Sequence, residues 1–218
     1  MMSFYLVTDH PVAVDSIDHL YPLGTMNDNS VNLRFNAKLR ELYPGKQISV
    51  LDFGCAGGGM VKSLLDEWQI AVGLEGSDYS LVNRRAEWVT IPDHLFTCDV
   101  RKPFTLHDGS GEPYPFDVVT AWEFMEHIEE PELPGVIDNV WRHLLSGGLL
   151  IGSTTDIDCE YMGVEHHRTR RPFQWWVDMF KRAGFIRCID LEEYFGDDWV
   201  RKVQFNFVFR RPYDHPDR

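Results

Sequence analysis

Short apolar runs alternate with segments whose apolar residues recur at helical spacing along most of the chain. The short runs predict strands at 48–53, 70–74, 95–97, 116–121, 149–153 and 185–191. The spaced segments predict helices at 31–42, 61–68, 79–88, 133–144 and 172–184. The polar stretch 101–115 is expected to be a loop. This alternation is typical of parallel strands joined by helices.

The end of the chain breaks the alternation. Phe205, Phe207 and Phe209 alternate with other residues in a last predicted strand, 203–209, which has no helix before it. Consecutive strands without a crossover helix must run antiparallel. We therefore expect an α/β fold, a doubly wound Rossmann-like sheet of seven strands that is mostly parallel with an antiparallel last strand. No linker or repeat divides residues 1–218, so we expect a single domain in which 1–45 form an N-terminal helical cap.

The charge and composition of the chain exclude some classes of binding partner. The chain has 218 residues, with 21 Lys and Arg against 34 Asp and Glu, a net charge of −13 that repels phosphate backbones and argues against nucleic acid. Its four cysteines form no Cys-x-x-Cys pair, which is typical of reduced thiols in the cytoplasm. No signal-like start and no long apolar run is present, so we expect a cytoplasmic protein that does not contact a membrane. The oligomeric state stays open.

A glycine cluster marks a candidate ligand site. The sequence VLDFGCAGGG at 50–59 falls where the first predicted parallel strand meets its helix, and glycine there lets backbone N–H groups approach a ligand. Glu75 ends the next strand, 23 residues after Asp52, where a carboxylate can accept hydrogen bonds from ribose hydroxyls. Together they predict a cofactor that contains a nucleoside, either a nicotinamide dinucleotide or S-adenosylmethionine.

From about residue 50 to the last strand, the chain resembles the class I S-adenosylmethionine-dependent methyltransferases. VLDFGCAGGG resembles the family's first motif, with Ala56 in place of its middle glycine, and GLEGSD resembles the ribose-binding second motif. CDV at 98–100, FDVVTAWEFMEHI and HLLSGGLLIGS are similar to three later motifs. The resemblance implies the methyltransferase reaction, with S-adenosylmethionine as cofactor and S-adenosylhomocysteine as product. The cofactor-binding residues that we expect are Asp52, Gly54, Cys55, Ala56, Gly58, Glu75, Gly76, Ser77, Asp99, Val100 and Trp122.

The segment 122–128 carries the information on the methyl acceptor. It lacks the Asn/Asp-Pro-Pro-aromatic motif of family members that methylate amide or exocyclic nitrogen, and it resembles small-molecule methyltransferases with Glu-His-Ile. The predicted catalytic residues are His127, as a base toward a hydroxyl, with Glu123, and with His166 and His167 from the loop 155–171. Each of these also has a purely structural interpretation. We expect a small hydroxylated acceptor and O-methylation.

Two alternatives remain. Glu123, Glu126 and His127, with the pair His166-His167, resemble the arrangement in small-RNA 2′-O-methyltransferases and ubiquinone-pathway O-methyltransferases, where a divalent metal binds the acceptor hydroxyls. Carboxylate and imidazole ligands suit magnesium, manganese or zinc, but we assign no residue as a metal ligand from the sequence. The second alternative is a non-catalytic partner subunit that binds the cofactor.

Overall fold

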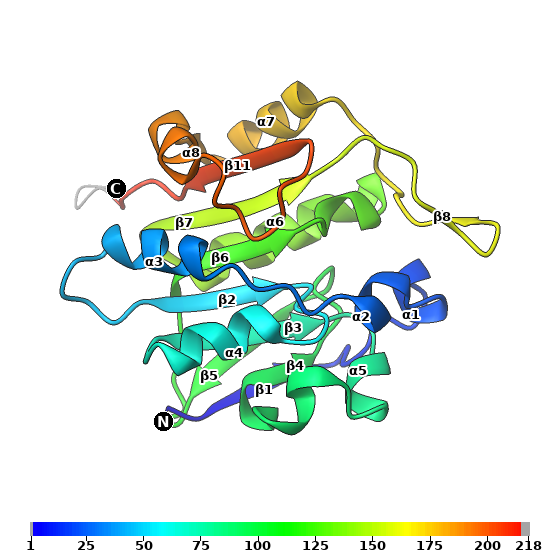
Figure 1. The fold of residues 1–218 in the computed structure, drawn as a ribbon, viewed down its shortest axis with the longest axis horizontal. Helices are drawn as coiled ribbons and strands as arrows, with labels where there is room; N and C mark the ends of the chain where they lie inside the picture. The colour runs from blue at the N-terminus through cyan, green and yellow to red at the C-terminus, as the bar shows by residue number, and fades with distance from the viewer. Residues whose placement is uncertain (1, 215–218) are drawn as a thin grey trace.

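The computed structural model describes residues 2–214 and contains the expected seven-stranded sheet (Figure 1). Its strands are β2 (Ser49–Phe53), β3 (Ile70–Glu75), β4 (Leu95–Thr97), β6 (Phe116–Trp122), β7 (Leu144–Thr154), β10 (Ile186–Arg187) and β11 (Phe205–Arg210). They lie in the order β10-β11-β7-β6-β2-β3-β4. The strands from β7 to β4 are parallel, whereas β11 runs antiparallel to both β7 and β10. The α/β class and the antiparallel last strand are thus confirmed.

Helices cover both faces of the sheet. One face packs against α3 (Leu33–Glu41), α4 (Gly59–Asp66) and α8 (Ile189–Phe195), and the other packs against α6 (Leu133–His143) and α7 (Phe173–Arg182). The strand positions alternate between the two resulting cores, since Val50 belongs to the first and Leu51 to the second. The short elements are α5 (Tyr79–Val82), η1 (Ala86–Val89), η2 (Pro92–His94), η3 (Met125–His127) and η4 (Glu130–Glu132).

The predicted strand at 185–191 is wrong beyond residue 187. Residues from Ile189 onward form α8, and only Ile186 and Arg187 pair with β11. Ile186, Ile189 and Leu191 are apolar at spacings that suit either a strand or a helix, so periodicity alone does not distinguish the two.

The N-terminal region also differs from the expected helical cap. It begins with β1 (Phe4–Thr8), which pairs antiparallel with β5 (Phe104–Asp108) inside the stretch predicted to be a loop. Helices α1 (Ile17–Leu20) and α2 (Leu23–Asn27) follow before α3. Both strands obtain their ladder hydrogen bonds from a segment about a hundred residues away, which a local pattern does not reveal.

The carboxyl ends of β2, β3, β4, β6 and β7 meet at one edge of the sheet. Beyond that edge lie α1 and α2 and the hairpin of β8 (Glu160–Tyr161) and β9 (Val164–Glu165), at the right of Figure 1. The fold therefore places two segments that are distant in sequence, 17–27 and 160–165, around one opening. Within residues 2–214, no helix combines the length and apolar character that crossing a bilayer requires.

Candidate functional site

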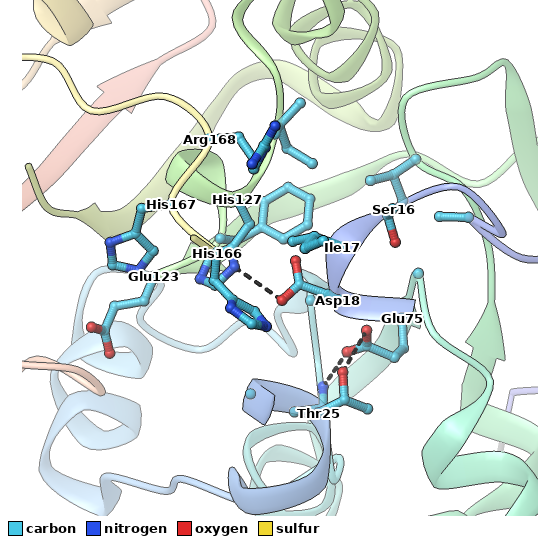
Figure 2. Close-up of a pocket in the computed structure, with 18 of the residues that line it drawn as sticks. Ser16, Ile17, Asp18, Thr25, Glu75, Glu123, His127, His166, His167 and Arg168 are labelled. Atoms are coloured by element: carbon cyan, nitrogen blue, oxygen red, sulfur yellow. Dashed lines mark hydrogen bonds and ion pairs between the residues drawn. The ribbon is translucent and has the colours of Figure 1, made fainter. Parts of the chain in front are cut away.

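A pocket of about 350 Å³ lies at this edge of the sheet. The ends of β2, β3, β4 and β6 form its floor, and residues 13–28 and the β8–β9 region form its walls. Figure 2 shows Thr25 and Glu75 on one side, with Glu123, His127 and His167 across from them. The pocket thus brings residues expected to bind the cofactor and residues expected to be catalytic into one space.

The glycine turn after β2 has the left-handed backbone that favours glycine. Gly54 has φ 74°, and a Cβ added there would lie 2.7 Å from the Phe124 ring. Gly58 has φ 85°, and a Cβ there would lie 2.6 Å from Leu95. Ala56 adopts φ 46°, so the residue that replaces the middle glycine is itself strained. Gly54 and Ala56 line the pocket, and Gly58 does not.

The N–H groups of this turn are already bonded within the protein. Those of Gly54 and Cys55 donate to Leu74 O, and that of Gly57 donates to Asp28 O at 3.1 Å. The expectation that backbone donors here face a ligand therefore does not hold for these residues, because the closely packed strands and the N-terminal segment use them.

Glu75 sits at the end of β3, lines the pocket and is only 6% exposed. Its carboxylate accepts hydrogen bonds from Ala56 N at 2.8 Å, Ser77 N at 3.2 Å and Thr25 Oγ1 at 3.3 Å. Burial raises the pKa of Glu75 despite these bonds. Gly76 lines the pocket beside it, whereas Ser77 lies behind.

Asp99 and Val100 also line the pocket, but the Asp99 carboxylate is engaged. Arg101 Nε lies 2.8 Å from Asp99 Oδ1 and Nη2 lies 2.9 Å from Oδ2. The same guanidinium contacts Asp15 and Glu132. Sequence reasoning missed Arg101, although its place two residues after Asp99 was a signal for a local ion pair.

Two expected cofactor residues, Asp52 and Cys55, border only a second, smaller hollow. Asp52 and Cys55 line it together with Gly54, Trp122 and Arg201. Asp52 Oδ1 accepts a hydrogen bond from Thr120 Oγ1 at 2.6 Å, and burial raises the pKa of Asp52 to about 7. Trp122 lines both spaces, and its indole N–H points to Met60 Sδ at 3.2 Å.

His127 forms a pair with Asp18 from α1, with 3.0 Å between Nδ1 and Oδ1 (Figure 2). Burial lowers the pKa of His127, but Asp18 and the nearby Glu126 and Glu123 outweigh it and raise it to about 9. Sequence reasoning missed Asp18, which lies 109 positions away and belongs to no motif. The pair uses Nδ1 of His127. The other ring nitrogen, Nε2, has no hydrogen bond to any of the described residues.

Glu126, His127 and His167 form a compact group. One potential ligand atom from each lies within 4.8 Å of the others, and the two imidazole rings are 4.9 Å apart. Glu126 is fully buried, and neither of its carboxylate oxygens has a hydrogen-bond partner among the described residues. Burial raises its pKa to about 7. His167 Nδ1 is bonded to Ile157 O at 2.6 Å, which leaves Nε2 available.

His166 and Glu123 have other partners. Both ring nitrogens of His166 are within 3.1 Å of carbonyl oxygens, of Val164 and Tyr21, so the side chain offers no free nitrogen and does not fit the predicted catalytic role. Glu123 adopts φ 46°, and its carboxylate pairs with Arg201. It does not join the Glu126 group.

Curated relatives match parts of the chain. An ubiquinone biosynthesis O-methyltransferase of Hahella chejuensis is 26% identical over 163 residues, covering 70% of this chain and 66% of that protein. A small RNA 2′-O-methyltransferase of Arabidopsis thaliana is 30% identical over 107 residues, covering 45% of this chain and 11% of that protein. The chain thus spans two thirds or less of the length of these relatives.

Solved structures share the fold over nearly the whole chain. An amino pentose methyltransferase of Micromonospora echinaspora with bound S-adenosylmethionine superposes with a TM-score of 0.58 at 15% identity, covering 88% of this chain and 95% of that one. An S-adenosylmethionine-dependent methyltransferase of Clostridium acetobutylicum gives 0.58 at 12% identity, covering 90% and 97%. A family profile described as a methyltransferase domain matches residues 30–208. The chain therefore belongs to the methyltransferase domain family, within the class I S-adenosylmethionine-dependent methyltransferases.

Proposed function

We propose that this protein transfers a methyl group from S-adenosylmethionine to a hydroxyl of a small acceptor. The observation that carries the proposal is the single pocket that joins Glu75 and the glycine turn to the His127–Asp18 pair. Bound S-adenosylmethionine supplies a methyl group already activated on a positively charged sulfur. A hydroxyl nucleophile must lose a proton during such a transfer, so a base near the methyl group favours O-methylation.

The pocket residues fit the cofactor. Gly54 and Gly76 border the pocket without side chains, and the buried Glu75 carboxylate at the end of β3 supports a role as the acceptor of ribose hydrogen bonds. Eight carboxylates and three arginines line the pocket, which favours neutral or cationic molecules over anionic ones. This charge supports a hydroxylated acceptor such as a sugar over a phosphorylated one.

His127 is the proposed base. Asp18 orients the imidazole through Nδ1 and, with Glu126 and Glu123, raises its pKa to about 9. Nε2 therefore takes the acceptor proton from the neutral form of the ring, so the rate of transfer should rise with pH toward about 9. Loss of a well-placed base costs about 10²- to 10⁴-fold in rate. His127→Asn should therefore abolish most turnover while leaving S-adenosylhomocysteine affinity unchanged.

The test is methyl transfer from labelled S-adenosylmethionine to catechol and methyl glucoside, each compared with an amine of matched size such as methyl glucosaminide. We expect labelled product from hydroxyl-only acceptors, and a matched His10→Asn variant, changed at an exposed histidine, should keep wild-type rates. Transfer to the amine alone would contradict O-methylation. Turnover that survives His127→Asn would exclude this base.

A metal-assisted form of the reaction, of the 2′-O- or catechol type, is supported by a specific observation. The unpartnered, fully buried Glu126 lies with His127 and His167, a donor set that suits manganese or zinc. The Asp18 carboxylate on His127 Nδ1 matches the outer contacts that orient metal-binding histidines. A divalent cation at these residues would lower the pKa of an acceptor hydroxyl.

Calorimetric titration with Mn²⁺ tests this form without an activity assay. We expect one site per chain, lost in Glu126→Gln and in His167→Asn. The matched control is Glu129→Gln, which removes a half-exposed carboxylate that pairs with Arg168 at the pocket rim. Equal Mn²⁺ binding by wild type and Glu126→Gln would leave the metal-independent base as the only supported form.

A further inference from the structure

The second, smaller hollow opens beside the main pocket at Gly54. Asp28, Gly54, Trp122 and Arg201 line both spaces, so the hollow is a side branch of the pocket. None of the catalytic candidates Glu123, His127, His166 and His167 borders it. Its role is therefore distinct from acceptor chemistry.

The shape of the cofactor assigns an occupant to this branch. A sulfonium carries three substituents that point in three directions: here the adenosyl group, the methyl group and an amino-acid arm. With the ribose at Glu75 and the methyl group directed toward His127, the arm must leave the sulfur along the remaining direction. The side branch, which meets the main pocket at Gly54, is a space open to this arm.

The arm ends in a carboxylate and an ammonium group. Arg201, Asp28 and Asp52 line the branch, and Glu123 lines the main pocket beside it. Arg201 Nη2 lies 3.1 Å from Asp28 Oδ1, and its Nε lies 3.2 Å from Glu123 Oε2. The Nε contact is an ion pair without hydrogen-bond geometry, and this buried nitrogen has no hydrogen-bond partner among the described residues. The guanidinium therefore retains capacity for an acceptor.

The other two arginines of the pocket are committed elsewhere. Arg101 binds three carboxylates, and Arg168 pairs with Glu129 on the acceptor side. The turn N–H groups of Gly54, Cys55 and Gly57, which could have bound an anion, donate to carbonyls. Among the described residues, Arg201 is thus the arginine that lines both the main pocket and the side branch.

Arg201 is held at the branch by its neighbours. It lies in the segment between α8 and β11, where Asn32 Nδ2 donates to Trp199 O at 2.8 Å. Trp199 is 6% exposed and packs on Phe195 and Trp122. Such anchoring limits the entropy lost when the side chain engages a ligand.

We propose that Arg201, flanked by Asp28 and Glu123, binds the amino-acid end of S-adenosylmethionine. The guanidinium takes the carboxylate, and Asp28 and Glu123 take the ammonium group, so each charge of the ligand meets a protein group of the opposite charge. This inference rests on the proposed function, because it requires the cofactor in the main pocket.

Calorimetry with two ligands tests the assignment. S-adenosylhomocysteine carries the carboxylate, and its decarboxylated analogue differs only in lacking it. Arg201→Met should weaken S-adenosylhomocysteine binding about ten- to a hundredfold and leave the analogue unchanged. The matched control is Lys202→Met, which removes a charge from the same segment at a residue paired only with the exposed Asp197. It should change neither affinity.

Arg201→Lys covers the case in which the methionine variant does not fold. It keeps the charge without the planar fork, so it should lose S-adenosylhomocysteine affinity severalfold and keep that of the analogue. Equal losses for both ligands would mean that Arg201 only supports the segment, and no loss would mean that it does not touch the ligand. Either result overturns the inference alone, whereas a wild-type protein that binds neither ligand overturns the proposed function as well.

Discussion

Glu75 concentrates three protein hydrogen bonds on one buried carboxylate that also faces the pocket. Its position fixes the glycine turn through Ala56 and the N-terminal segment through Thr25. A ligand that bonds to Glu75 therefore meets a group whose orientation is already set, which lowers the cost of binding.

The first prediction concerns this residue. Glu75→Ala should lower S-adenosylhomocysteine affinity at least about tenfold, because ribose hydroxyls lose a charged acceptor. Calorimetric titration measures the effect. Glu132→Ala, which removes a carboxylate of the Arg101 network at the pocket wall, is the comparison and should cost less. Wild-type affinity in the Glu75 variant would place the ribose elsewhere.

The sequence identified residues that belong to local motifs and missed those that reach the pocket from distant segments. Glu75 and His127 follow predicted strands, so topology alone brought them to one edge. Asp18 and Arg201 come from outside any motif, and only the folded chain shows that they contact His127 and Glu123. His166 was predicted because of its type, but burial against two carbonyls determines its role.

Among the elements, α4 ends in an unusual way. Trp68 follows the helix with φ 62° and is 84% exposed, while Gln69 N donates to Leu64 O. This is the position where helices favour glycine. Trp68 thus adopts a strained backbone conformation, and its exposed side chain buries little surface in return.

Trp68→Gly should therefore stabilise the protein by about 1 kcal/mol, the approximate cost of a left-handed conformation for a residue with a Cβ. Urea unfolding measures it. Leu81→Gly provides the contrast, because Leu81 is an exposed apolar residue inside α5, where glycine should destabilise by a similar amount. Destabilisation by both substitutions would contradict the strain argument.

We expect the last residue of α6, His143, to make the stability of the protein depend on pH. His143 is buried, stacks on Phe104 of β5 with 4.3 Å between ring centroids, and bonds Asn139 O through Nδ1. Burial lowers the pKa of His143 from 6.5 to about 4. The unfolded chain thus binds this proton more readily than the folded one, so stability is complete above pH 6.5 and falls toward pH 4, by roughly 3 kcal/mol for this group.

His143→Phe keeps a ring against Phe104 and removes the titrating group. Its free energy of unfolding should fall less than that of the wild type between pH 7 and pH 5. The exposed His10→Gln variant should behave like the wild type. Parallel pH curves for all three proteins would exclude His143 as the source.

The parallel strands and their helices were predictable because burial on both faces leaves clear apolar runs. The β1–β5 pair was not, because two distant segments form it and neither run is decisive alone. The strand predicted at 185–191 failed where the apolar spacing allowed α8 as well.

For the whole molecule, the N-terminal segment encloses the pocket through contacts with several strand ends. Ala13 N donates to Gly76 O at 2.9 Å, Asp99 N donates to His10 O at 2.9 Å, and Asp18 holds His127. A ligand of the pocket must contact this segment or displace it.

Hydrogen exchange should therefore report cofactor binding. On addition of S-adenosylhomocysteine, amides in residues 10–20 should exchange more slowly, because the ligand stabilises the enclosed form. The exposed tip of the β8–β9 hairpin at Met162 should not change. Unchanged exchange in 10–20 at saturating ligand would show that binding does not involve this segment.

The part of the chain that matches the family begins at residue 30, yet Asp18, Thr25 and Asp28 reach the pocket from before it. About a third of the residues that line the pocket, nine of 28, thus belong to a peptide that the sheet does not need for its own strand order. The leading segment therefore shapes the pocket and, through the contact of Asp18 with His127, also holds the proposed base. Grafting residues 9–28 between homologues, with Asp18 retained, accordingly tests whether acceptor preference follows this segment.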